Sequence, residues 1–228
     1  MAEKSSFNIV VLGGGGVGKT CIILRYIRDK FDPTYIPTIQ DVFSKSVDYN
    51  GQTYTLQLVD TAGQDELQAI TDTAFSSADA FCFVFSLTSI ISLNEIDNFY
   101  NRVKASTSGN QPIILIGNKS DLTEEIIADI DKEADQVKNK INAIGFLKTS
   151  AKEGTGINDA FQAIIQTLVC PSKSKSSSQH NSSANQESGG CCEILYTSNV
   201  FLFLILFDNI FLNVMKIFCS STKKKKQI

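Results

Sequence analysis

Residues 13–20, which read GGGGVGKT, constrain the fold of this chain more than any other stretch. They match the pattern G-x-x-x-x-G-K-[ST] and lie between a short apolar run at 7–12 and a helix-like run at 21–27. Glycines allow backbone N–H groups to converge on an anion, and a helix N-terminus adds unpaired donors. In this strand, loop and helix context the pattern predicts a phosphate-binding loop. The alternative, a plain glycine-rich turn, is disfavoured by the flanking elements.

Two side chains of this loop carry the predicted chemistry. Lys19 can reach the β- and γ-phosphates of a nucleotide, and the Thr20 hydroxyl can ligate Mg²⁺. The sequence therefore predicts a nucleoside phosphate as ligand, with Mg²⁺ as its cofactor.

Apolar runs alternate with helix-like stretches along residues 7–169. Strands are expected at 7–12, 42–49, 53–59, 80–87, 112–117 and 146–149, and helices at 21–27, 67–75, 92–104, 124–141 and 157–169. Asn50-Gly51, between the second and third runs, favours a β-hairpin and thus one antiparallel pair. The alternation predicts an α/β fold with a doubly wound, mostly parallel six-stranded sheet and one antiparallel edge strand. Ligands of such sheets bind at the carboxyl ends of the strands.

A second motif, DTAGQ at residues 60–64, directly follows the strand expected at 53–59. Asp60 is placed to contact the Mg²⁺ shell, usually through water. Gly63 leaves its N–H free to approach a γ-phosphate, and Gln64 could orient an attacking water. On its own, D-x-x-G is also a common turn sequence.

A third motif, NKSD at residues 118–121, follows the strand expected at 112–117. The Asp121 carboxylate can accept two hydrogen bonds from the N1–H and 2-amino groups of guanine, and adenine lacks both. A capped turn entering the next helix is the alternative, but the order after a phosphate-binding loop favours guanine. Residues 150–152, Ser-Ala-Lys, complete the set with a backbone N–H available for guanine O6.

Charge is divided between the two parts of the 228-residue chain, whose length suits one domain and a tail. Residues 171–228 carry seven lysines and three acidic residues, so they are basic, while residues 1–170 are acidic. The acidic part argues against nucleic acid as a partner, and the basic tail favours an anionic membrane surface.

The six cysteines and the single histidine show no zinc-binding spacing. Cys21 and Cys82 lie in apolar runs and are expected to be buried thiols. His180 lies in a polar tract, which excludes His-based catalysis. Residues 1–6 carry no signal peptide, so a reducing, cytosolic compartment is expected.

With these motifs in order, residues 5–170 resemble a Ras-superfamily small GTPase, and the loop at 35–41 resembles the Ras subfamily (Ras, Rap and Di-Ras). The resemblance implies a P-loop G domain over residues 1–170. It also implies that Phe31 flanks the guanine ring, that Tyr35 covers the phosphates and that Thr38 reaches Mg²⁺ and the γ-phosphate. Gly15 stands where a side chain would obstruct an incoming arginine finger.

The site residues implied by the resemblance fall into four groups. Nucleotide contacts are expected from Gly13, Gly15, Gly16, Val17, Gly18, Lys19, Thr20, Cys21, Phe31, Tyr35, Thr38, Gly63, Asn118, Lys119, Asp121, Ser150, Ala151 and Lys152. Metal contacts are expected from Thr20, Thr38 and Asp60, and catalysis from Gln64, Lys19, Gly63 and Thr38. The effector loop comprises Tyr35, Ile36, Pro37, Thr38, Ile39, Gln40 and Asp41. Ile36 and Gln40 replace the usual acidic residues of that loop, which should suit basic effectors less well.

These residues predict a monomeric switch that hydrolyses GTP to GDP and binds effectors through residues 31–41 and 60–70. Its expected partners are an exchange factor, a GTPase-activating protein and Ras-binding effectors. A non-hydrolysing GTP-bound scaffold would lack Gln64 or carry a bulky residue at position 15, and neither is the case. A small-molecule kinase would lack the motif at 118–121.

The C-terminal part predicts a disordered linker at 171–190 and a membrane-targeting tail at 191–228. Cys192 would begin a prenylation box if the chain ended at residue 195, and Cys191 would be a second lipid site. The apolar run at 196–218 and the lysines at 223–226 follow instead. A membrane span, an interfacial helix and a splice or read-through extension all remain open. The expected location is the cytoplasmic face of the plasma membrane.

Overall fold

The computed structural model describes residues 4–32, 38, 40–62 and 74–170. Its elements in chain order are β1 (Ser6–Leu12), α1 (Lys19–Arg28), β2 (Gln40–Tyr49), β3 (Gln52–Thr61), β4 (Ala80–Ser86), α3 (Ile90–Asn94), α4 (Ile96–Ser106), β5 (Ile113–Asn118), α5 (Ile130–Lys140), β6 (Gly145–Lys148) and α6 (Ile157–Val169). All described residues belong to one compact unit.

The strands form one six-stranded sheet in the order β2-β3-β1-β4-β5-β6. β2 pairs antiparallel with β3 at the edge, and the remaining neighbours pair in parallel. Asn50 and Gly51 both have positive φ in the turn between β2 and β3, as a tight hairpin requires. The predicted doubly wound sheet with one antiparallel edge strand is therefore confirmed.

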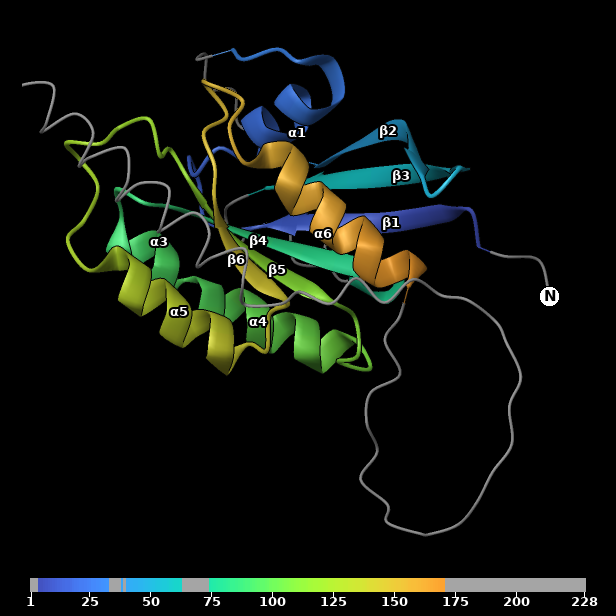
Figure 1. The fold of residues 1–228 in the computed structure, drawn as a ribbon. Helices are drawn as coiled ribbons and strands as arrows, with labels where there is room; N and C mark the ends of the chain where they lie inside the picture. Colours follow the sequence, from blue (N-terminus) through green and yellow to red (C-terminus); the bar gives the residue numbers. More distant parts are fainter. Residues whose placement is uncertain (1–3, 33–37, 39, 63–73, 171–228) are drawn as a thin grey trace, which may run out of the picture. The chain divides into compact units, whose positions relative to one another are not determined.

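Helices cover both faces of the sheet (Figure 1). Along β1, Ile9 and Val11 belong to the core cluster that includes α1 and α6. Val10 and Leu12 belong to the cluster on the opposite face, which includes α3, α4 and α5. A central strand with both faces covered must be apolar at every position, which explains the continuous apolar runs of β1, β4 and β5.

Two expected helices differ from the structure. The helix expected at 124–141 begins only at Ile130, because Asp129 has left-handed backbone angles (φ 60°) and Ile127 N donates to Leu87 O at 3.1 Å. The helix expected at 92–104 is two helices, α3 and α4, and the first is capped by the Ser89 side chain, which accepts from Ser92 N. Of the helix expected at 67–75, residues 67–73 lie outside the described residues. Within the described ranges, no helix is long and apolar enough to cross a membrane.

Candidate functional site

Two glycines of the loop between β1 and α1, Gly13 and Gly18, stand where a side chain would clash. Gly13 has φ 149°, and a Cβ there would lie 2.0 Å from Val84 O in the neighbouring strand. Gly18 has φ 98°, and its Cβ would lie 2.4 Å from Asn118 Nδ2. Nothing lies within 4 Å of a Cβ built on Gly15 or Gly16, so this part of the loop faces open space. The loop is therefore packed on one side and accessible to a ligand on the other.

Lys19 folds back over this loop from the first turn of α1. Its Nζ donates to Gly13 O at 2.8 Å and to Gly14 O at 2.9 Å, and only 6% of the residue is exposed. Burial lowers the pKa of Lys19 to about 8, although Asp60 and Glu95 oppose the shift. An ammonium held in this desolvated position is well placed to pair with phosphate oxygens. Their negative charge would compensate for the water that the ammonium lost on burial.

Three oxygen-bearing side chains from separate segments meet beside Lys19. Thr20 donates through Oγ1 to Asp60 Oδ2 at 2.6 Å, and Thr38 Oγ1 lies 3.0 Å from Thr20 Oγ1. Asp60 Oδ1 is buried and has no hydrogen-bond partner among the described residues. Burial raises the pKa of Asp60, and the bond from Thr20 partly offsets this.

This set of hydroxyl and carboxylate oxygens fits Mg²⁺, which typically takes one or two protein oxygens and completes its shell with water and phosphate. The orphaned Asp60 Oδ1 supports the fit, because a buried carboxylate oxygen without a partner is costly. No cluster of three His, Cys, Asp or Glu side chains occurs in the described part of the chain. Because Mg²⁺ takes an octahedral shell of oxygens, nucleotide and water oxygens would complete the shell around these side chains.

A second cluster connects this loop to the ends of β5 and β6. Asn118 donates through Nδ2 to Val17 O at 2.9 Å and accepts at Oδ1 from Thr149 Oγ1 and Ala151 N, both at 3.2 Å. Asn118 is 2% exposed, so these bonds form in a dry environment. This side chain holds the phosphate loop and the loop after β6 in fixed register.

Asp121 lies at the same edge of the sheet and has its carboxylate held in place. Ser150 donates through Oγ to Asp121 Oδ1 at 2.7 Å, and Lys152 Nζ lies 4.0 Å from Oδ2. Lys119 has left-handed backbone angles (φ 69°), which turn the chain between Asn118 and Asp121. The residues predicted to read a base come from two loops that are separate in sequence, and the bond from Ser150 to Asp121 brings them into one cluster.

Comparison with known proteins bears on this arrangement directly. Residues 8–170 match the Ras family, well over half of the chain. The chain belongs to the Ras family. It is 38% identical to Ras-like protein rasU of Dictyostelium discoideum over 167 residues, which cover 73% of this chain and 78% of that protein. It is 33% identical to Ras-like protein rasS of the same organism over 184 residues, covering 79% of this chain and 91% of that protein.

As a member of the Ras family, the chain is a GTP-binding small GTPase that hydrolyses GTP and acts as a signalling switch. The phosphate loop, the oxygen cluster and the Asn118–Asp121 cluster all lie at the carboxyl ends of strands, where parallel sheets bind ligands. The family match favours this switch over the small-molecule kinase considered above.

Several other residues predicted for the Ras-type site lie within the described ranges but make none of the side-chain contacts given above. Phe31 is exposed beyond the end of α1, and Cys21 is half-buried, with its Sγ 3.7 Å from Asp32 O. Gln40 and Asp41 open β2 and pair with Thr61 and Asp60 on β3. Predicted residues outside the described ranges are Tyr35, Ile36, Pro37, Ile39, Gly63, Gln64, Cys191 and Cys192.

Two residues near the site were not predicted from the sequence. A Cβ built on Gly14 would lie 2.2 Å from Glu95 Oε2, so the Glu95 carboxylate rests against the phosphate loop. Arg25 bonds the backbone of the loop after β6. Neither belongs to a spaced motif, and only the packing of α1 and α3 against the site brings them there.

Proposed function

We propose that GTP and GDP bind with Mg²⁺ held by Thr20, Thr38 and, through water, Asp60. The buried, unpartnered Asp60 Oδ1 beside the two hydroxyls supports this assignment. When bound, Mg²⁺ would neutralise charge that develops on the phosphates during hydrolysis. Asp121 recognises guanine by accepting from its N1–H and 2-amino groups. Asn118 and Ala151 contact the other edges of the base.

Hydrolysis in this proposal relies on positioning and electrostatics. Lys19 already points its Nζ into the loop that would hold the phosphates, and backbone N–H groups of the loop add further donors. Gln64 orients the attacking water. The Gly63 N–H donates to the γ-phosphate, and Thr38 reaches both Mg²⁺ and the γ-phosphate. No arginine of the chain is assigned to the transition state, so a partner's arginine would supply most of the acceleration.

Asp60→Asn tests the metal assignment. Because residues that orient a metal through its outer shell change metal affinity ~10–100-fold, the free Mg²⁺ needed to slow GDP release should rise by about that factor. GDP dissociation measured across a Mg²⁺ titration gives the value. Asp48→Asn is the matched control, since Asp48 is an exposed carboxylate at the other end of β2. An unchanged Mg²⁺ requirement in Asp60→Asn would refute the assignment.

We further propose that the chain, as a monomer, binds effectors through residues 31–41 and 60–70, and that an exchange factor and an activating protein are its other partners. Ile36 and Gln40 reduce the negative charge of this surface relative to Ras. Electrostatic steering toward basic effector domains is therefore weaker, and apolar contact should contribute more to affinity.

The tail supports a proposal for localisation at the cytoplasmic face of the plasma membrane. Residues 223–226 are four consecutive lysines, each contributing ~1 kcal/mol at an anionic surface. The run at 196–218 adds apolar area. A shorter form ending at residue 195 would instead attach through a prenyl group on Cys192 and a second lipid on Cys191.

Cys192→Ser separates the two modes of attachment. In a form truncated after residue 195, the substitution should release the protein to the soluble fraction, because acylation at Cys191 requires prior membrane contact. In the full chain, Cys192 is internal, so the same substitution should leave the protein with the membranes. Fractionation of both forms, with and without the substitution, is the measurement. A full chain that is soluble and monomeric would contradict the proposal.

A further inference from the structure

Arg25, in the last turn of α1, donates four hydrogen bonds. Its Nε donates to Ala151 O at 2.8 Å, and its Nη2 donates to Lys152 O. Its Nη1 donates to Asp29 O and to Asp29 Oδ1, both at 3.1 Å. Only 17% of the Arg25 side chain is exposed, whereas Asp29 is 92% exposed.

Two of these acceptors, the Ala151 and Lys152 carbonyls, belong to the loop after β6. This loop lies beside α1, 126 residues away in sequence (Figure 1). The loop turns back on itself through Gly154 N, which donates to Ser150 O at 2.7 Å, and Gly154 packs on Arg25: a Cβ there would lie 3.5 Å from Arg25 Cδ. Arg25 thus fixes two successive carbonyls and the return of the loop.

Ala151 is the residue whose position matters most for base recognition. Its carbonyl accepts from Arg25, and its N–H donates to Asn118 Oδ1 at 3.2 Å, on the side of the loop that faces Asn118 and Asp121. Because a planar guanidinium donates in a rigid fork, it holds two carbonyls in a geometry that a lysine or glutamine cannot reproduce. The partial burial of the guanidinium strengthens these bonds.

We propose that Arg25 is a positioning residue for guanine: it fixes the Ala151–Lys152 backbone so that the Ala151 N–H, which donates to Asn118 Oδ1, is shared with O6 when the nucleotide binds, and thereby slows nucleotide release. This role rests on the contact between Ala151 and O6 in the proposed function. In this proposal Arg25 acts on the nucleotide only through the Ala151 N–H. Its effect on release should therefore depend on the 6-oxo group that this N–H contacts.

Dissociation of GDP from the full chain, compared with that of 6-thioguanosine diphosphate, tests the role. The second nucleotide keeps the N1–H and the 2-amino group that Asp121 accepts, but a sulfur, which is a weak acceptor, replaces the 6-oxo group. Arg25→Ala should accelerate GDP release ~10-fold, since two charge-assisted bonds to the loop are lost. Release of the 6-thio nucleotide should change less than ~3-fold, because the contact that Arg25 supports is already weakened.

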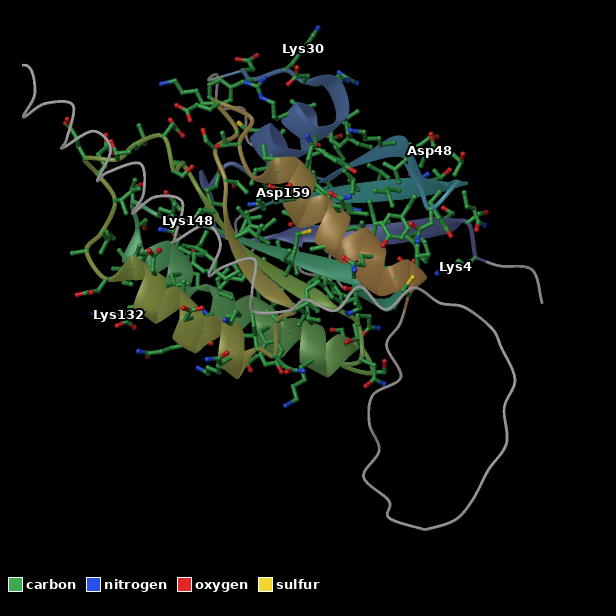
Figure 2. The ribbon with its side chains drawn as sticks, in the orientation of Figure 1. Lys4, Lys30, Asp48, Lys132, Lys148 and Asp159 are labelled. Carbon is green, nitrogen blue, oxygen red and sulfur yellow. The ribbon has the colours of Figure 1, made fainter. Side chains whose placement is uncertain are left out.

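Arg25→Lys and Arg25→Gln keep the measurement valid if Arg25→Ala does not fold, and both should accelerate GDP release by an intermediate factor. Arg28→Ala and Lys30→Ala are the matched controls, because both residues are exposed and Lys30 points away from the fold (Figure 2). Neither control should change the release of either nucleotide.

Two results would overturn the role in distinguishable ways. If the unsubstituted chain releases both nucleotides at the same rate, the Ala151–O6 contact of the proposed function is wrong and the role of Arg25 fails with it. If the unsubstituted chain discriminates but the Arg25 variants accelerate both nucleotides equally, or neither, the contact stands and Arg25 is only a structural residue.

Discussion

Asp121→Asn should weaken GDP binding ~10³-fold or more and create binding of xanthosine diphosphate. The Asp121 carboxylate is 9% exposed and is held by Ser150, so it cannot turn to water when a ligand fails to pair with it. Guanine offers two N–H donors to that carboxylate, and an amide can accept from only one of them. Xanthine carries a 2-oxo group where guanine has its amino group, and this oxygen would accept from the new amide.

Competition binding with GDP, ADP and xanthosine diphosphate measures this change in specificity. The unsubstituted chain should bind ADP at least ~10⁴-fold more weakly than GDP, because adenine would leave a desolvated carboxylate unpaired. Asp131→Asn is the control: Asp131 accepts from Lys148 at 2.6 Å on the surface, where ion pairs contribute ~0–1 kcal/mol. Comparable binding of ATP and GTP by the unsubstituted chain would show that Asp121 does not read the base.

Gly15→Val should retain GTP binding but lose the hydrolysis stimulated by an activating protein. A Cβ at Gly15 meets nothing within 4 Å, so the chain itself can accommodate the valine. The same open space is where a partner's arginine must approach the phosphates. The loss should reach ~10⁵-fold, a factor that is known for Ras itself and is carried over to this relative. Gln64→Leu should have the same result, through loss of the oriented water.

Single-turnover hydrolysis with and without a Ras-type activating protein measures the effect. Gly13→Val is the informative contrast, because its Cβ would lie 2.0 Å from the Val84 carbonyl and its backbone has φ 149°. That variant should lose nucleotide binding or fold poorly, whereas Gly15→Val should have a normal melting temperature. Stimulated turnover that is unaffected in both Gly15→Val and Gln64→Leu would indicate a different catalytic arrangement.

The sheet and most of the site were predictable because both depend on local patterns. Each face of β1 packs on a different cluster, so burial on both faces gave the apolar run that marks the strand. Lys19, Asn118 and Asp121 lie in motifs at strand ends, and parallel pairing alone brings strand ends together.

The remaining features depend on contacts between distant segments, which no local pattern records. Residues 124–129 have helix-like composition, yet the bond from Ile127 N to Leu87 O holds them outside α5. Arg25 reads as an ordinary charged residue of an amphipathic helix. Two of its four hydrogen bonds go to nearby Asp29, and only the fold brings the Ala151 and Lys152 carbonyls within reach of the other two. The roles assigned to Gln64 and Cys192 stay predictions, because both residues lie outside the described ranges.

The contact between Gly14 and Glu95 makes this glycine tolerant of a small side chain but not silent. An alanine at position 14 would place its methyl group 2.2 Å from Glu95 Oε2, the far end of a flexible side chain, which can turn away at little cost. The carboxylate would then leave its place against the phosphate loop, and Lys19 would lose one of the two negative charges that oppose the lowering of its pKa. A change of one methyl group in the loop would therefore act on the charge of the loop rather than on its shape.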